Sequence, residues 1–257
     1  MSTGGAAVTA GGAGGTTGGV TGVVFDLDGV LLDSEHLWEQ SWTEFAASAS
    51  YRWTAADTGA CQGMSTPEWS AYLSDRTRRP AGDCADGVVD RMAGHYRAGH
   101  VELLPGALAL VTETAARVPV AMASSAPRRI IDTVLDTMGL RGAFSATVSS
   151  EEVPRGKPSP DVYATAAQRL GLQPARSFAV EDTSNGIRAA AAAGLGVIAM
   201  PGPRYALADD AAAVALSVHI GLAEVRAELR RRLDAALAGG AGRPRNTQQL
   251  SRKGNGS

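Results

Sequence analysis

Short apolar runs alternate along the chain with longer stretches in which apolar residues recur every three or four positions. The short runs predict strands at 22–27, 118–124, 146–150, 177–181, 196–200 and 213–217. The longer stretches predict helices near 107–117, 127–138, 160–170 and 185–193. Strands and helices that alternate at this spacing predict an α/β fold, in which helices cover both faces of a parallel sheet.

One stretch breaks the alternation, because residues 36–104 contain no convincing strand. Trp38, Trp42 and Phe45 follow the i, i+4, i+7 spacing of one helix face. We therefore predict a helical insert at 36–104, which holds all 4 tryptophans of the chain. A Leu-Pro-Gly segment at 104–106 is the predicted return hinge.

The sheet domain is then built from two pieces of the chain, 22–35 and 105–238. Its last element is a predicted amphipathic helix that packs on the sheet. The apolar positions of this helix are Leu222, Val225, Leu229, Leu233 and Leu237. The Gly/Ala-rich end 1–21 and the basic end 239–257 have no apolar period, so both are predicted to be disordered.

Composition narrows the class of protein. Hydrophobic residues make up 44% of the 257 residues and charged residues 19%, which suits a packed core. Neither a membrane span nor a secretory signal is recognisable, and 2 cysteines are too few for a disulfide framework, so a cytoplasmic location is expected. The 239–257 end holds four basic residues and no acid, which leaves the body acidic and argues against nucleic-acid binding.

Polar side chains follow the predicted strands at the edge where parallel sheets bind ligands. The first strand ends in Asp26 and Asp28, and Gly29 predicts a turn that aims both carboxylates at one pocket. Adjacent buried carboxylates repel unless a cation or a shared proton compensates them. A structural pair of loop carboxylates is the alternative interpretation.

The second strand ends in Ser124 and Ser125, followed by Pro127. Hydroxyls and free N–H groups at a helix start suit a phosphate, but from this segment alone plain helix capping, with Pro127 as the first helical residue, is the preferred interpretation. Lys157 lies between glycine and proline and is one of two lysines in the chain, the other being Lys253. A compact ammonium near carboxylates and phosphate explains this choice, and a chance surface lysine is the alternative.

The fourth strand ends in Glu181 and Asp182, a second acidic pair at the same edge. Oxygen ligands from separate loops suit Mg²⁺. Capping of the next helix by residues 182–185 is the alternative interpretation.

Four motifs in this order, DLDGV, ASS, GKPSPDVY and EDTSNGI, resemble those of the haloacid dehalogenase superfamily. The insert after DLDGVLLDSEHLW resembles that of the subgroup containing β-phosphoglucomutase and phosphoglycolate phosphatase. The resemblance covers roughly 22–221. It implies a Rossmann-like, doubly wound parallel sheet with an inserted all-helical cap.

The resemblance also implies roles. Asp26 would be the nucleophile that forms an aspartyl phosphate, and Asp28 the general acid and base. Ser124 would bind phosphoryl oxygens, and Lys157 would hold nucleophile and phosphate together. Metal ligands for Mg²⁺ would be Asp26, Asp28 through its carbonyl, and Asp182, with Glu181 as a ligand or a support behind the ligands. Gly29 and Ser125 are predicted substrate-binding positions.

Two activities share this site in the family, phosphate hydrolysis and phosphate migration by a mutase. A mutase must anchor a second phosphate, yet residues 61–67, Cys-Gln-Gly-Met-Ser-Thr-Pro, contain no basic side chain. We therefore expect a phosphatase of a small phosphorylated metabolite, most simply a sugar phosphate. Gln62, Ser65 and Thr66 are candidate substrate contacts. For Trp38, Trp42 and Trp69 the preferred interpretation is a place in the insert core, and a role in shaping the pocket is the alternative.

A non-catalytic, receiver-like module that binds phosphate or Mg²⁺ is the second alternative to a phosphatase. Receivers also place acidic residues, a hydroxyl and a lysine on a parallel sheet, but they lack such an insert. The expected partner is a small phosphate ester, without nucleic acid or membrane, and the expected state is a monomer or weak homodimer.

Overall fold

The computed structural model describes residues 19–61, 64–202 and 206–240. The ends predicted to be disordered, 1–21 and 239–257, lie almost entirely outside these ranges, as does Gln62. Of the helices within these ranges, none combines the length and apolar character that a membrane crossing requires.

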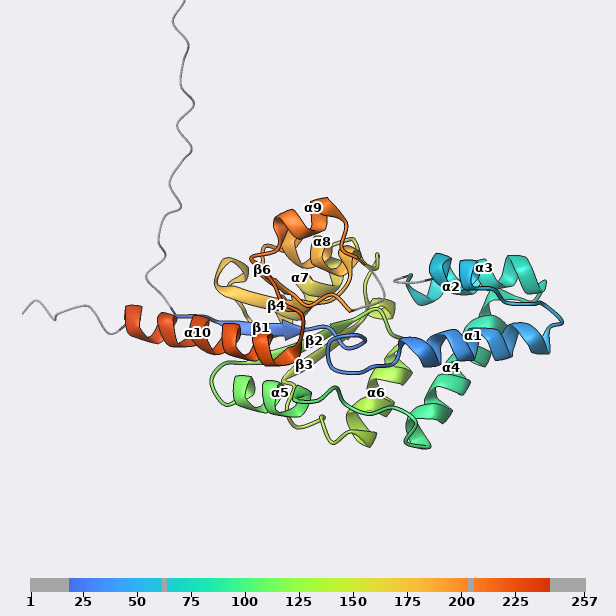
Figure 1. Cartoon of the computed structure of the whole chain (residues 1–257), viewed down its shortest axis with the longest axis horizontal. Coiled ribbons are helices and arrows are strands. Elements are labelled where there is room, and N and C mark those ends of the chain that lie inside the picture. Colours follow the sequence, from blue (N-terminus) through green and yellow to red (C-terminus); the bar gives the residue numbers. More distant parts are fainter. Residues whose placement is uncertain (1–18, 62–63, 203–205, 241–257) are drawn as a thin grey trace, which may run out of the picture.

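A six-stranded parallel sheet forms the centre of the molecule (Figure 1). Its strands are β1 (Gly22–Phe25), β2 (Val120–Ser124), β3 (Ala146–Ser149), β4 (Ser177–Glu181), β5 (Gly196–Ala199) and β6 (Ser217–Val218). The order across the sheet is β3-β2-β1-β4-β5-β6, so β1 lies between β2 and β4. The parallel α/β fold predicted from the sequence is confirmed.

Helices cover the two faces of the sheet in separate layers (Figure 1). One layer contains α5 (Ala107–Ala115), α6 (Arg128–Thr137) and α10 (Leu222–Gly240), and the other α7 (Asp161–Arg169), α8 (Ser184–Ala192) and α9 (Asp209–Val214). Short 3₁₀ turns, η1 (Ser150–Glu152) and η2 (Pro174–Arg176), complete the connections. Successive side chains of a strand point to opposite faces of the sheet and so belong to two apolar clusters. Val23 and Phe25 pack with the first layer of helices, and Val24 packs with the second.

The last predicted strand, 213–217, is wrong over most of its length. Ala213 and Val214 belong to helix α9, and β6 comprises just Ser217 and Val218. The short apolar run fits either structure by pattern alone, and the acidic residues in the first turn of α9 favour a helix start there.

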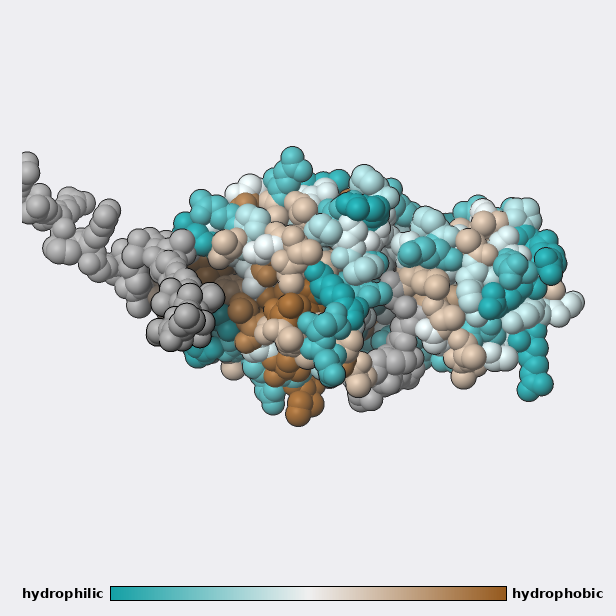
Figure 2. Space-filling model, turned by 90° about the horizontal axis from the view of Figure 1, so that it is seen from above, coloured by the Kyte–Doolittle hydropathy of each residue, from teal (hydrophilic) through white to brown (hydrophobic). Residues whose placement is uncertain are grey.

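The predicted insert is helical, as expected, and lies beyond the carboxyl ends of the strands (Figure 1). It consists of α1 (Glu35–Ser48), α2 (Ala55–Cys61), α3 (Thr66–Thr77) and α4 (Ala81–Arg97). Its aromatic residues gather into one cluster, in which the Trp42 ring centroid lies 5.8 Å from Trp38, 6.0 Å from Trp53 and 6.2 Å from Trp69. On the face seen in Figure 2 the insert is teal, pale and tan, without the brown of strongly hydrophobic residues, and Trp42, Trp53 and Trp69 are buried.

The two segments that join the insert to the sheet run side by side. Leu104 donates its backbone N–H to the carbonyl of Leu31 at 2.8 Å, and Leu32 bridges to Leu103. The chain therefore leaves and re-enters the sheet domain through one narrow neck. The exact boundaries of two separate domains stay a prediction.

A buried carboxylate, Asp57, ties the insert together. It accepts hydrogen bonds from the Thr54 hydroxyl at 2.6 Å, the Tyr72 hydroxyl at 2.8 Å and the Arg76 Nε at 2.9 Å. Burial works to raise its pKa, but these donors outweigh burial and bring the pKa to about 2. The ionised carboxylate is thus a structural element of the insert.

Asp57→Asn is expected to lower the free energy of unfolding by about 2 kcal/mol at pH 7, since each pKa unit corresponds to about 1.4 kcal/mol. Because the pKa is lower in the folded state, this stabilisation is present above the unfolded pKa near 4 and is lost as the pH falls toward 2. Urea unfolding followed by tryptophan fluorescence measures this loss of unfolding free energy, because all the tryptophans lie in the insert. The exposed Asp75→Asn is the control. The same loss at pH 7 and pH 3 would contradict this assignment.

Candidate active site

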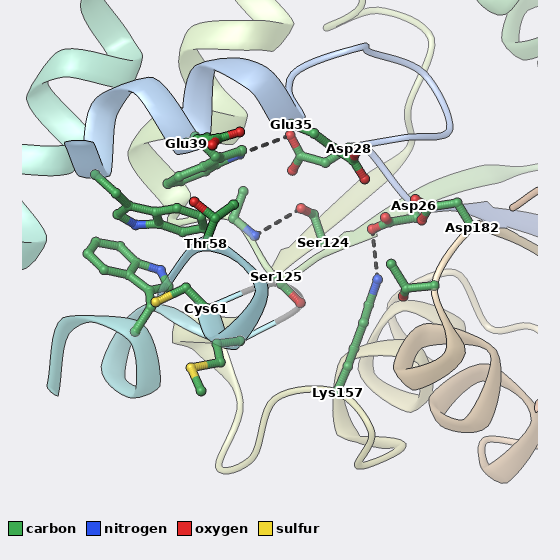
Figure 3. A pocket seen from close by; sticks show the side chains of 16 residues that line it. Asp26, Asp28, Glu35, Glu39, Thr58, Cys61, Ser124, Ser125, Lys157 and Asp182 are labelled. Carbon is green, nitrogen blue, oxygen red and sulfur yellow. Dashed lines mark hydrogen bonds and ion pairs between the residues drawn. The ribbon is translucent and has the colours of Figure 1, made fainter. Parts of the chain in front are cut away.

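The end of strand β1 delivers two carboxylates into one cavity, which Asp26 and Asp28 both line (Figure 3). Asp26 is buried, with 6% of its surface exposed. The chain then turns at Gly29, where φ is +76° and an added Cβ would lie 2.1 Å from an Asp182 carboxylate oxygen. Glycine is therefore required at this position both for its backbone conformation and for the close approach of Asp182.

Lys157 reaches the same point from the loop after β3, although it lies 131 residues from Asp26 in sequence. Its Nζ donates to Asp26 Oδ1 at 2.7 Å and to Glu181 Oε1 at 2.5 Å. Burial would lower the pKa of this ammonium, but the two carboxylates raise it above its ordinary value. Lys157 therefore stays positively charged inside the site.

The pKa of Asp26 moves in the opposite direction from that of an exposed ion-paired carboxylate. Burial raises it to about 7; Lys157 opposes this rise, and the Glu181 carboxylate adds to it. A cation besides Lys157 would favour the ionised form of Asp26.

Glu181 is fully buried, and both of its oxygens accept hydrogen bonds from the protein. Oε1 faces Lys157 and the Tyr163 hydroxyl, the latter at 3.0 Å. Oε2 accepts the backbone N–H groups of Asp182 and Thr183, each at 2.9 Å. Burial works to raise the pKa of Glu181, but Lys157 and these donors hold it below its ordinary value. Glu181 thus serves as a fixed anion that positions Lys157.

Asp182 differs, because its buried Oδ1 has no hydrogen-bond partner among the described residues. Burial, with the Glu181 and Asp26 charges, raises the pKa of Asp182 well above its ordinary value. Ligand atoms of Asp26, Glu181 and Asp182 all lie within 4.8 Å of one another. An unpaired carboxylate oxygen in an all-oxygen donor set fits a hard divalent cation such as Mg²⁺.

Asp28 lies on the insert side of the cavity. The Trp38 Nε1 donates to its Oδ1 at 3.3 Å (Figure 3), and the Ser34 hydroxyl donates to the same oxygen. Burial raises the pKa of Asp28, and these two donors oppose the rise. A carboxyl group with a raised pKa retains a proton to donate, which suits a general acid.

Ser124 and Ser125 end strand β2 and also line the cavity. Ser124 is buried, and its Oγ accepts the backbone N–H of Ala126 at 3.0 Å. The capping interpretation is not supported, because α6 begins at Arg128 and Pro127 precedes the helix instead of opening it. The Ser124 hydroxyl remains able to donate to an anion in the cavity.

A family model described as haloacid dehalogenase-like hydrolase matches residues 20–194. The chain belongs to this hydrolase family. The resemblance inferred from the four motifs is therefore confirmed, and the site described above lies within the matched segment.

Named proteins resemble this member of the haloacid dehalogenase-like hydrolases to different extents. Hexitol phosphatase B of Escherichia coli (strain K12) is 35% identical over 195 residues, covering 69% of this chain and 84% of that protein. The bifunctional riboflavin kinase/FMN phosphatase of Arabidopsis thaliana is 42% identical over 103 residues, and the chain spans 27% of its length. The structure of CbbY from Rhodobacter sphaeroides in complex with phosphate matches with a TM-score of 0.73 at 25% identity, covering 84% of this chain and 99% of that one.

The structure brings together most of the site that the family motifs predict. Besides Asp26 and Asp28, the cavity is lined by Ser124, Ser125, Lys157 and Asp182. Gly29 and Glu181 do not line it, but Gly29 lies against Asp182 and Glu181 bonds to Lys157. Gln62 lies outside the described residues. Ser65 and Thr66 are not among the lining residues, and the Ser65 hydroxyl bonds instead to Glu68 at the start of α3.

The sequence interpretation missed much of the wall that the insert contributes. Trp38, Trp42 and Trp69 pack in the insert core and also line the cavity, so both roles considered for them from the sequence are present. The other residues of this wall are Glu35, Glu39, Thr58, Cys61 and Met64. Acidic and aromatic residues at 35, 38, 39 and 42 follow helical spacing, which is the signal that marks one face of α1.

Proposed function

We propose that this hydrolase is a Mg²⁺-dependent phosphatase that acts through an aspartyl-phosphate intermediate. The observation that carries the proposal is that Asp26 bonds to the Lys157 ammonium and also lies close to Asp182, which has an unpaired carboxylate oxygen. Its substrate is a small phosphorylated metabolite, in keeping with the activity that the name of hexitol phosphatase B gives for that relative.

In the first step, an Asp26 carboxylate oxygen attacks phosphorus, and the bond from phosphorus to the leaving oxygen breaks. Asp28 gives its proton to that oxygen, so the product leaves as an alcohol. Lys157 neutralises charge on the transferred group, and Ser124 donates a hydrogen bond to a phosphoryl oxygen.

In the second step, Asp28 takes a proton from water as that water attacks the phosphorus. The bond from phosphorus to Asp26 breaks, which releases inorganic phosphate and restores the carboxylate. Asp26 and Asp182 would hold Mg²⁺, whose charge, when bound, stabilises the transferring phosphoryl group.

Water must be excluded while the ester forms and admitted while it is hydrolysed. We propose that the insert acts as a cap over the cavity, since its tryptophans and the catalytic carboxylates line the same space. The neck at residues 31–32 and 103–104 is the place where such a movement would be absorbed.

A phosphate-release assay over sugar and polyol phosphates, run with Mg²⁺ and with a chelator, tests the proposed function. Phosphate should appear with Mg²⁺ and fall to background with the chelator. A coupled isomerisation assay separates a mutase, which would move phosphate without releasing it. No release from any ester in the presence of Mg²⁺ would refute the phosphatase and favour a non-catalytic module.

Asp28→Asn is expected to lower kcat/KM for an alkyl phosphate by about 10²–10⁴-fold, the usual contribution of general acid catalysis. The loss should be much smaller for p-nitrophenyl phosphate, because nitrophenolate leaves without a proton. The exposed Asp33→Asn on the following segment is the control. Equal losses on both esters would show that Asp28 is not the proton donor.

A further inference from the structure

The cavity has two chemically different halves. Asp26, Lys157 and Asp182 stand on the sheet side, and α1 presents Glu39 on the other side (Figure 3). If phosphate occupies the sheet side, the alcohol half of the substrate faces the insert. The insert wall therefore selects the leaving group.

Three tryptophans dominate this wall. The ring centroids of Trp38 and Trp42 lie 5.8 Å apart, and Trp69 lies 6.2 Å from each of them. All three line the cavity. Indole rings attract cations to their faces more strongly than other aromatic side chains do.

Glu39 lies in the same wall, one residue after Trp38 on α1, and is partly buried. Within the described part of the chain, no residue bonds to its carboxylate. Among the lining residues described, Lys157 is the one basic side chain, and Asp26 and Glu181 already engage it. A partly exposed carboxylate that no protein cation engages is free to pair with a positive charge on a ligand in the cavity.

Apart from its carboxylates, the described part of this wall offers few hydrogen-bonding groups to a ligand. The Thr58 hydroxyl accepts from Trp53 Nε1 at 2.9 Å, and Trp38 Nε1 donates to Asp28. The remaining lining residues of the insert include Cys61 and Met64, whose sulfur atoms are weak hydrogen-bonding groups. A neutral polyol could bond to the Glu39 carboxylate but would leave its charge without a counter-ion.

We infer that the preferred substrate is a phosphate monoester whose alcohol half carries a positively charged amine, as in an amino sugar or amino alcohol phosphate. The ammonium pairs with Glu39 and contacts the tryptophan faces, while phosphate binds at Asp26 and Lys157. This inference rests on the proposed phosphatase function and specifies the substrate class of the same site.

Two matched substrate pairs test the inference: glucosamine 6-phosphate against glucose 6-phosphate, and 2-aminoethyl phosphate against 2-hydroxyethyl phosphate. In at least one pair, kcat/KM should be at least tenfold higher for the amine. Glu39→Gln should bring that ratio close to one. Glu44→Gln is the matched control, because Glu44 lies on the solvent side of the same helix, and it should keep the ratio.

Equal rates in both pairs, preference for the hydroxyl member, or a ratio unchanged by Glu39→Gln would overturn the inference. So would hydrolysis of p-nitrophenyl phosphate without hydrolysis of any of the four esters. In each of these cases Mg²⁺-dependent release from p-nitrophenyl phosphate leaves the proposed function standing. If that release is absent as well, the proposed function fails and the substrate class falls with it.

Discussion

Asp26→Asn is expected to lower the rate of phosphate release by on the order of 10⁴-fold or more, because an amide oxygen is too weak a nucleophile to form the phosphoryl ester. Asparagine has nearly the same size, and its side-chain oxygen can still accept the hydrogen bond from Lys157 that the carboxylate accepts at 2.7 Å. The fold and the phosphate site should therefore survive the substitution. Single-turnover phosphate release measures the loss.

Trapping of labelled enzyme separates a lost nucleophile from a damaged site. The native chain, quenched in acid during turnover of a labelled ester, should retain label that hydroxylamine removes, as an acyl phosphate does. Asp26→Asn should retain none, whereas the exposed Asp75→Asn should label normally. Label retained by Asp26→Asn would place the covalent step on another residue.

Lys157→Ala is expected to reduce both activity and stability. The ammonium is buried between Asp26 and Glu181, so its removal leaves two carboxylates facing each other without a cation. Breaking a buried ion pair in this way typically costs about 3–5 kcal/mol. Loss of the positive charge at the transferred group should lower kcat by roughly 10³-fold, near the upper end for one electrostatic donor.

The stability deficit of Lys157→Ala should depend on pH. Without the lysine, the folded-state pKa values of Asp26 and Glu181 rise above the unfolded values, so the folded variant binds more protons and loses stability as the pH rises. Thermal unfolding at pH 5 and pH 8 measures this, with the exposed Arg155→Ala from the same loop as control. A deficit that is larger at pH 5 would contradict the role of Lys157 as counter-charge.

The sheet side of the site was predictable from sequence for a topological reason. In a parallel sheet the carboxyl ends of the strands meet at one edge. Once the strands are recognised, the sequence therefore predicts that Asp26, Ser124 and Asp182 lie close together. Lys157 was predictable because its residue type is rare in this chain and its position between glycine and proline has no explanation in helix propensity.

The insert side was not predictable in the same way. Helical spacing marks one face of α1, but whether that face meets Asp26 and Asp28 depends on how the insert docks on the sheet, and no local pattern encodes that docking. Glu39 and Trp69 come from different helices, yet they line one wall. Ser65 has the chemistry of a substrate contact, but the helix start uses its hydroxyl to bond Glu68.

The neck between insert and sheet has an evolutionary consequence. Because residues 31–32 and 103–104 lie side by side, the chain enters and leaves the insert at one place, and the insert's other attachment is the packing of α4 on α6, where Asp90 pairs with Arg129. Such a module can be exchanged or remodelled without disturbing any strand. Proteins that share the same site on the sheet can therefore evolve toward new substrates through changes in the insert alone.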